Sequence, residues 1–103
     1  MIKISVYYPN SAGVKFDMNY YVNRHLPMVQ KKVGPALKAV GAEQGVAGAA
    51  PGSPAPYVAV GHLMFDSVEA FQSAFAPHAE AIMADVANYT NVQPIIQIAE
   101  VKL

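Results

Sequence analysis

The first residues of the chain alternate between apolar and polar side chains. An alternation of this kind has the period of a strand that buries one face, so we predict a strand over residues 2–8. The apolar positions are Ile2, Ile4, Val6 and Tyr8, and the intervening ones are Lys3, Ser5 and Tyr7. Residues 57–65 form a second run, but with apolar side chains on both faces, which predicts a strand that is covered on both sides.

A helical period of three to four residues appears after the first strand, over residues 17–33. Asp17 is placed to cap the N-terminus of this predicted helix, and the Gly-Pro pair at residues 34–35 favours its end. Pro27 donates no backbone hydrogen bond and restricts the residue before it. We therefore expect the helix to kink or end just past His25.

The same period returns in the second half of the chain and predicts a helix that ends at about Ala87. Asp66, followed by Glu69, resembles a capping box for this helix, and Ser67 is an alternative cap. Pro77 lies inside the stretch and predicts a kink.

Three further stretches are less regular. Residues 36–47 alternate weakly between small and β-branched side chains, and Gly41 and Gly45 favour a bent or bulged strand there. Residues 48–56 are rich in glycine, alanine and proline and predict a loop. Residues 94–103 carry a β-branched run that is typical of a strand.

These elements follow the order strand, helix, strand, strand, helix, strand in a single domain over residues 1–103. This order predicts an α+β, ferredoxin-like βαββαβ fold, in which an antiparallel four-stranded sheet carries two helices on one face. No segment remains to cover the other face, although the strands at 57–65 and 94–103 are apolar on both sides. We therefore expect a homodimer that packs sheet against sheet.

Composition narrows the possible functions. Hydrophobic residues make up 53% of the chain and charged residues 14%, and the formal net charge is zero. We therefore expect no nucleic acid and no membrane as partners. Cysteine is absent, which excludes disulfides and thiolate chemistry. The first strand begins at once and the apolar runs are too short for a membrane span, so we expect a cytoplasmic protein.

One short stretch, residues 17–27, holds most of the reactive side chains. Asp17, Tyr21 and His25 are spaced four apart and share one face of the predicted helix, with Tyr20 beside them. Imidazole titrates near neutral pH, which makes His25 the best candidate for a general base or acid. The alternative role is structural, with His25 bonded to a backbone carbonyl at the kink and Asp17 serving only as the helix cap.

Other candidates lie outside this stretch. His62 alternates onto one face of its strand, and His78 falls on the apolar stripe of the second helix, where each could equally be a core or interface residue. The histidines lack the spacing of a metal site and no glycine-rich nucleotide motif is present, so we expect no metal and no cofactor. Asp85 lies near a helix C-terminus, where its charge opposes the helix dipole and calls for a partner such as Arg24.

Motifs along the whole chain match a known family. They are Phe16-Asp17, Tyr20-Tyr21, His25-Leu26-Pro27, Gly34-Pro35, the junction at residues 63–67, Asp85, the turn Asn88-Tyr89-Thr90, and Pro94. In these residues the chain resembles the EthD family, named for ethyl tert-butyl ether degradation. The resemblance implies the dimeric α+β barrel, in which two ferredoxin-like subunits pack sheet to sheet.

The family resemblance also implies an activity. Bacterial members are associated with the degradation of ethers and other xenobiotics beside cytochrome P450 systems, and they are often described as reductases or oxidoreductases. The tyrosine and histidine of the family fall on Tyr21 and His25, and its acidic residue at a helix end falls on Asp85.

Our first hypothesis is a small oxidoreductase-type enzyme acting on a hydrophobic, aromatic or ether-derived compound in catabolism or secondary metabolism. His25 and Tyr21 are its predicted catalytic residues. The predicted substrate-binding residues are Tyr20, His62, His78 and Asp85. The alternatives are a cofactor-independent decarboxylase or cyclase, an accessory protein that binds a hydrophobic product for a partner oxygenase, and a purely structural dimerisation domain.

Overall fold

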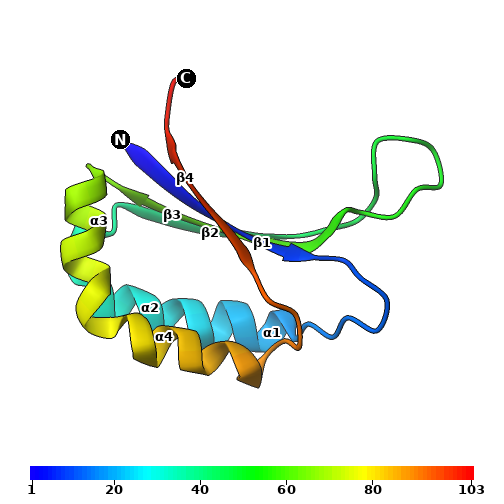
Figure 1. Ribbon diagram of the computed structural model, residues 1–103, viewed down its shortest axis with the longest axis horizontal. Coiled ribbons are helices and arrows are strands. Elements are labelled where there is room, and N and C mark those ends of the chain that lie inside the picture. The colour runs from blue at the N-terminus through cyan, green and yellow to red at the C-terminus, as the bar shows by residue number, and fades with distance from the viewer.

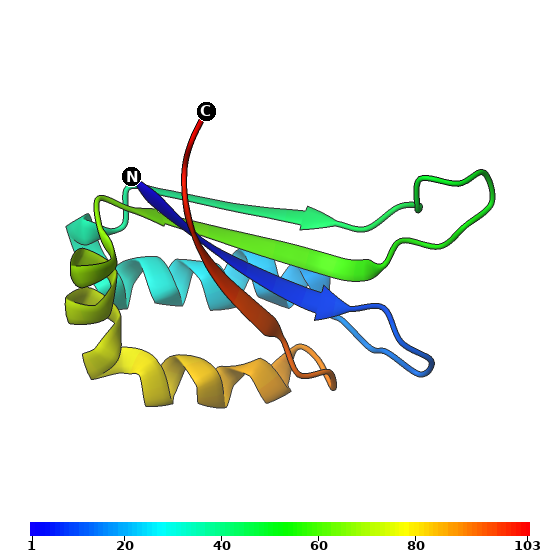
Figure 2. The same ribbon diagram turned by 45° about the horizontal axis from the view of Figure 1, so that its top comes forward.

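A four-stranded antiparallel sheet forms one layer of the molecule. The computed structural model describes residues 1–103, and its strands are β1 (Ile2–Pro9), β2 (Ala39–Gln44), β3 (Tyr57–Phe65) and β4 (Ile95–Glu100). They lie in the order β2-β3-β1-β4, and every neighbouring pair is antiparallel. Figure 2 shows this order across the sheet, with the loop between β2 and β3 extending past the ends of these two strands.

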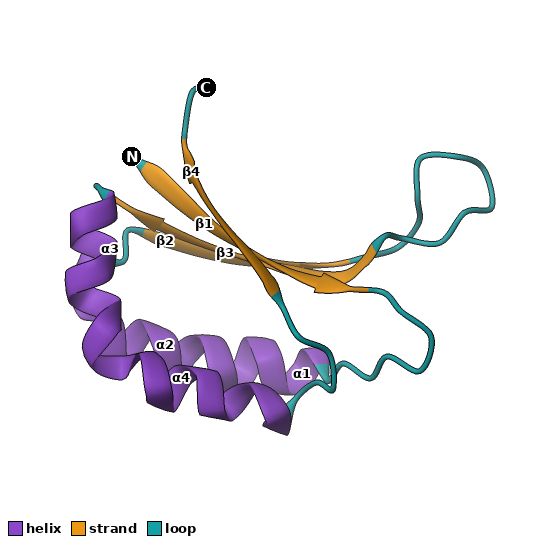
Figure 3. Cartoon of the chain, viewed as in Figure 1, coloured by secondary structure: helices purple, strands orange, loops and turns teal.

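The helices form the second layer, and all of them lie on one face of the sheet (Figures 1 and 3). They are α1 (Met18–Tyr20), α2 (Leu26–Val33), α3 (Val68–Phe75) and α4 (Ala79–Asp85). The α+β ferredoxin-like arrangement predicted from the sequence is therefore confirmed. No helix is both long enough and apolar enough to cross a membrane.

The first predicted helix is continuous but irregular. Asp17 caps it as expected, since its Oδ1 accepts a hydrogen bond of 3.0 Å from the Tyr20 amide. Residues 21–25 form a π-helical turn between α1 and α2, and the Leu26 amide bonds to the Tyr21 carbonyl five residues earlier. The chain stays helical through Pro27, so the irregularity that we expected past His25 is this widened turn rather than an end.

The second predicted helix is divided at Pro77, as expected. A 3₁₀ turn, Ala76–His78, separates α3 from α4, and the two helices run in different directions (Figure 1). Of the two candidate caps, Ser67 is the one observed, because its Oγ accepts a 3.0 Å hydrogen bond from the Ala70 amide.

The two less regular strands are shorter than predicted, and the predicted bulge lies elsewhere. β2 starts at Ala39 because Gly34 takes a positive φ of 76° and begins a 3₁₀ turn. β2 pairs with β3 in unbroken register past Gly41, so of the bent or bulged strand that we expected there, the bulge is wrong. The one register shift of the sheet lies between β1 and β3, where Tyr8 pairs with Ala59 but Pro9 pairs with Tyr57. β4 ends at Glu100, three residues before the predicted strand end.

The core lies between the two layers and has two parts. One part is mainly aliphatic, and its buried members are Ile2, Ile4, Val29, Val33, Leu63, Phe65 and Ile82. The other part is rich in tyrosine, with Tyr8, Tyr21, Leu26, Ala59 and Tyr89. Polar hydroxyls are therefore concentrated at one end of an otherwise apolar interior, next to the π-helical turn.

Candidate active site

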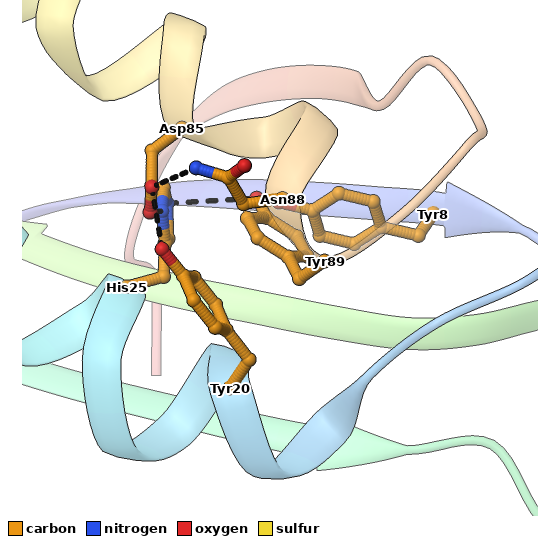
Figure 4. A network of polar contacts seen from close by, with 6 residues as sticks. All are labelled: Tyr8, Tyr20, His25, Asp85, Asn88 and Tyr89. Atoms are coloured by element: carbon orange, nitrogen blue, oxygen red, sulfur yellow. Dashed lines mark hydrogen bonds and ion pairs between the residues drawn. The ribbon is translucent and has the colours of Figure 1, made fainter.

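A buried histidine and a carboxylate join the two helical segments. His25 belongs to the π-helical turn and is only 5% exposed, and Asp85 is the last residue of α4. The His25 Nδ1 lies 2.8 Å from Asp85 Oδ2. Figure 4 shows the Asp85 side chain directed from its helix toward His25. The pairing explains how a carboxylate is tolerated at a helix C-terminus, where the helix dipole disfavours negative charge.

Asp85 accepts two further hydrogen bonds through its other oxygen. The Tyr20 hydroxyl donates to Oδ1 at 2.7 Å, and the Asn88 amide donates to the same atom at 2.9 Å (Figure 4). Burial alone would raise the pKa of Asp85, but the hydrogen bonds from Asn88, His25 and Tyr20 outweigh it and lower the pKa. Asp85 is thus ionised at neutral pH, and its partner is His25 rather than the Arg24 suggested by the sequence.

The environment of His25 determines which ring nitrogen carries the proton. Burial disfavours the imidazolium and lowers the pKa of His25, against the opposing effect of Asp85. In the neutral ring, the hydrogen that faces the carboxylate is on Nδ1, because an ionised carboxylate only accepts hydrogen bonds. Nε2 therefore carries a lone pair at neutral pH and can accept a proton.

Two buried tyrosines continue the network beyond Nε2. The Tyr89 hydroxyl lies 3.5 Å from His25 Nε2, and the Tyr8 and Tyr89 hydroxyls are 2.6 Å apart. Burial raises the pKa of both phenols well above its ordinary value, so both keep their protons. Figure 4 shows the resulting line of polar groups from Asp85 through His25 and Tyr89 to Tyr8.

Tyr21 forms a wall of the site. Its ring stacks on the imidazole of His25, with the ring centroids 5.6 Å apart and an interplanar angle of 15°. Its hydroxyl lies against the backbone of β3 at Gly61, where the Cβ of any other residue would overlap it. Burial raises the pKa of Tyr21 as well, so at neutral pH it is a phenol and not a phenolate.

These groups border an apolar cavity of about 80 Å³ between the sheet and the helices. Of its 18 lining residues, 14 are hydrophobic, a count that includes the tyrosines, and Tyr8, His25 and Tyr89 are the lining residues that take part in the buried polar network. The exposed side chains of Met83 and Ile96 also line it, so the cavity reaches the surface between α4 and β4. A small hydrophobic molecule entering there would meet His25 Nε2 and the Tyr89 hydroxyl.

The other two histidines lie apart from this network. His62 borders the cavity between Gly61 and Leu63, but the alternation of β3 turns its side chain to the opposite face. There its Nε2 lies 3.0 Å from Glu43 Oε1. His78 lies in the turn between α3 and α4 and does not line the cavity. No group of three or more metal-ligating side chains is close enough to hold an ion.

The sequence pointed to some members of the network and missed others. The structure brings together Tyr20, Tyr21, His25 and Asp85 from the predicted set. The predicted set lacks three members of the network, Tyr8, Asn88 and Tyr89. Tyr8 carried one usable signal, its place on the buried face of an alternating strand, whereas Tyr89 sits in a turn sequence that reveals nothing about its burial.

Comparisons with known proteins agree with this fold. The family model of the EthD domain matches residues 14–93. An EthD-like protein from Ralstonia eutropha JMP134 has a crystal structure with a TM-score of 0.95 and 42% sequence identity, covering 99% of this chain and 92% of that one. A comparison with curated proteins finds no match.

Two more distant structures share the fold. An EthD family protein from Bacillus halodurans C-125 has a TM-score of 0.65 at 18% identity, with 99% of each chain covered. HapK from Hahella chejuensis has a TM-score of 0.60 at 15% identity, covering 99% of this chain and 93% of that one. At these identities the likeness concerns the fold and not the chemistry.

Proposed function

This chain belongs to the EthD family, and from that premise we propose that it is a small enzyme that removes a proton from a hydrophobic, aromatic or ether-derived compound. One observation carries the proposal. Asp85 holds Nδ1 of a buried, neutral His25, which leaves the lone pair of Nε2 at an apolar cavity. A base with a pKa near or below neutrality is available at pH 7 and still returns its proton readily.

The hydrogen bonds around Asp85 support the same role. When His25 Nε2 takes a proton, the ring becomes an imidazolium, and the ionised Asp85 at 2.8 Å stabilises that charge. Tyr20 and Asn88 hold the carboxylate in place from either side. Tyr21 limits the rotation of the imidazole by stacking on it. In this proposal Tyr21 is a positioning residue and not the proton acceptor.

The fate of the deprotonated compound sets the reaction class. As an oxidoreductase, the enzyme would allow the electron pair left on the substrate to pass to dioxygen, with dioxygen reduced and the substrate oxidised. As an isomerase or cyclase, it would let the same electron pair form a new bond within the substrate. We place the proton removal at His25 in every case, because the proposal rests on that group alone.

The test uses three hydrophobic carbon acids, namely indene, 1-indanone and the larger anthrone. The wild-type protein should accelerate deuterium uptake from D₂O into at least one of them, as measured by mass spectrometry with and without dioxygen. His25→Gln should lower that rate by about 10² to 10⁴-fold, the usual contribution of a general base. His78→Gln, outside the cavity, is the matched control and should leave the rate unchanged.

Full retention of exchange in His25→Gln would overturn the proposal. Uptake of dioxygen during the same reaction would select the oxidoreductase class, and exchange without dioxygen uptake would select proton transfer alone. The folded state of each variant is checked by its thermal midpoint, so that a lost rate is not confused with lost structure.

A second candidate is an accessory protein that binds a hydrophobic compound for a partner oxygenase. The apolar lining of the cavity favours it, because the 14 hydrophobic residues among the 18 that line it still number 11 without Tyr8, Tyr21 and Tyr89, and these contribute binding rather than chemistry. This candidate requires that indene and 1-indanone bind without any exchange in the wild-type protein. Calorimetric titration of the same compounds therefore separates it from the enzyme.

We also propose that the chain forms a homodimer through its sheet. The surfaces involved are the face that no helix covers, here called the open face, and the edge formed by β4. β4 is an edge strand, and three of its isoleucines, Ile95, Ile96 and Ile98, are 55%, 50% and 46% exposed. An apolar edge of this kind is stabilised when a second copy covers it. Ile95→Lys should lower the solution mass toward that of a monomer in light scattering. Val22→Lys on the first helical segment, 40% exposed, is the matched control and should leave the mass unchanged.

A further inference from the structure

The structure points to the Tyr8–Tyr89 hydroxyl pair as the oxygen-binding part of the site. We propose that Tyr89 donates a hydrogen bond to the carbonyl oxygen of an enolisable hydrophobic compound, while His25 removes the proton from the adjacent carbon. This inference rests on the proposed function of His25 and names the class of substrate on which it acts.

The Tyr8–Tyr89 pair has one hydroxyl hydrogen that it can donate to a ligand. Each phenol carries a single hydrogen, and the 2.6 Å contact between Tyr8 and Tyr89 uses one of the two. His25 Nε2 attracts a hydrogen on its side of the pair, so Tyr8 donates to Tyr89 and the Tyr89 hydrogen faces Nε2. At 3.5 Å this last contact is longer than a well-formed hydrogen bond. The Tyr89 hydrogen is therefore readily taken over by a better acceptor.

The spacing between the base and the donor suits a carbonyl compound. The proton-bearing carbon and the oxygen of an H–C–C=O unit are about 2.4 Å apart, from standard bond lengths and angles. His25 Nε2 and the Tyr89 hydroxyl are 3.5 Å apart and approach such a unit from outside. One atom can then contact the C–H while the other donates to the oxygen. A hydrocarbon without the oxygen would leave the Tyr89 hydrogen unmatched.

The surroundings favour a donor that stays protonated. Tyr8 is 2% exposed and Tyr89 is 3% exposed, and both lie in the tyrosine-rich half of the core. Their pKa values are raised by burial, so neither loses its proton to an enolate at neutral pH. Tyr8 holds the Tyr89 hydroxyl in place before any ligand arrives, and a preorganised donor of this kind stabilises developing negative charge without reorganisation.

The chemical step balances without any added reagent. The C–H bond breaks and its proton forms a bond to His25 Nε2. The electron pair of that bond becomes the C=C bond of the enolate, and the carbonyl π pair moves to oxygen. The oxygen then carries the negative charge and accepts the hydrogen bond from Tyr89, which keeps its own proton. Return of the proton to the same or another carbon completes exchange or isomerisation.

The test measures binding of 4-nitrophenolate, a stable aromatic oxyanion that mimics an enolate and changes its absorbance on binding. Tyr89→Phe should weaken its binding by about 10- to 100-fold, the usual effect of losing a hydrogen bond to a charged group. The affinity for 4-nitrotoluene, which has nearly the same shape but a methyl group in place of the phenolate oxygen, should be unchanged. Tyr8→Phe should give a smaller loss for the phenolate, because it removes only the group that positions Tyr89.

Tyr7→Phe is the matched control, because Tyr7 is the neighbour of Tyr8 on β1 and faces the other side of the sheet. It should leave the affinity for both probes unchanged. The inference is overturned if wild-type protein does not bind 4-nitrophenolate, or if Tyr89→Phe binds it as tightly as wild type. If Tyr89→Phe does not fold, the loss in Tyr8→Phe decides, and equal binding by that variant and wild type also overturns it.

Failure of this inference is distinguishable from failure of the proposed function. A general base at His25 is tested by deuterium exchange, whereas the donor at Tyr89 is tested by equilibrium binding. When Tyr89→Phe is combined with His25→Gln, it should still weaken the binding of 4-nitrophenolate, because the donor acts without the base. If His25→Gln keeps full deuterium exchange while Tyr89→Phe still weakens the binding of 4-nitrophenolate, the general base at His25 is ruled out. The oxygen-binding role of Tyr89 then stands by itself.

Discussion

Two histidine–carboxylate pairs lie on opposite sides of the same sheet, and they differ in every respect that bears on catalysis. His25 meets Asp85 in the core at 2.8 Å, with 6% of its side chain exposed. His62 meets Glu43 on the open face at 3.0 Å, with 21% of its side chain exposed and 64% of the glutamate exposed. An imidazole and a carboxylate thus meet once in an apolar interior and once near solvent.

The two pairs also engage different ring nitrogens. Asp85 contacts Nδ1 of His25, so the free nitrogen is Nε2, at the cavity. Glu43 contacts Nε2 of His62, so the free nitrogen is Nδ1, which is buried and has no hydrogen-bond partner. The comparison teaches that a histidine beside a carboxylate suggests a base only when its second nitrogen faces a space that a substrate can enter.

The largest expected effect comes from removing each carboxylate charge in turn. Asp85→Asn should lower the deuterium exchange rate by about 10²-fold or more, because the imidazolium loses its counter-ion and the ring its preferred tautomer. Glu43→Gln should leave the rate within about 2-fold, since a solvent-exposed pair contributes little. Exchange is measured by mass spectrometry at pH 7. Equal losses in the two variants would contradict the distinction between the pairs.

Two glycines, one on each side of the sheet, extend the comparison to the free energy of unfolding. Gly61→Ala should lower the free energy of unfolding by about 1–3 kcal/mol, because the new methyl group overlaps the Tyr21 hydroxyl and forces its ring to move. Gly41→Ala on β2 meets nothing within contact distance and should change it by less than about 0.5 kcal/mol. Denaturant titration measures both, and an unaffected Gly61→Ala would show that Tyr21 is not held against β3.

The pH dependence of the free energy of unfolding is a third test of the buried His25–Asp85 pair. Burial holds the pKa of His25 below its ordinary value of 6.5, so the unfolded chain binds a proton before the folded protein does. The free energy of unfolding should therefore fall as the pH drops from 6.5 through the folded pKa of His25. The pKa of Asp85 is also lowered, so its contribution is complete above pH 3.8 and is lost as the pH falls further.

Denaturant titrations between about pH 7.5 and about pH 5.5 test the first of these windows, a range of about one unit on either side of an ordinary histidine pKa. His25→Gln should have a shallower slope than wild type there, because it lacks the group whose folded pKa is lowered. The same slope in wild type and His25→Gln would contradict a depressed His25 pKa.

The smallest expected effect concerns the outer part of the network. Asn88→Ala removes one of the hydrogen bonds to Asp85 and should lower the free energy of unfolding by about 0.5–1.5 kcal/mol. The exchange rate should fall less than in Asp85→Asn, because Tyr20 and His25 still hold the carboxylate. Gln72→Ala, at an exposed position of α3, is the control. A loss as large as that of Asp85→Asn would make Asn88 a main support of the site.

Local patterns in the sequence were enough to predict most of the fold. The alternation of Ile2, Ile4 and Tyr8 marks the buried face of β1, and these three residues are 8%, 2% and 2% exposed. Asp17 caps the first helix as its position indicates, and Pro77 divides the second. These features depend on neighbours within a few residues, so the chain specifies them without reference to its tertiary structure.

The candidate site has one part that depends on local sequence and another that depends on tertiary packing. The sequence by itself determined that His25 lies on one helical segment with Tyr20 and Tyr21, because that depends only on helical spacing. Only the tertiary structure decided its partners: Asp85 is 60 residues away, and Tyr8 and Tyr89, which complete the network, are 81 residues apart. Residues so distant meet only when α4 packs beside the π-helical turn over β1, and that packing also decides which nitrogen of His25 faces the cavity.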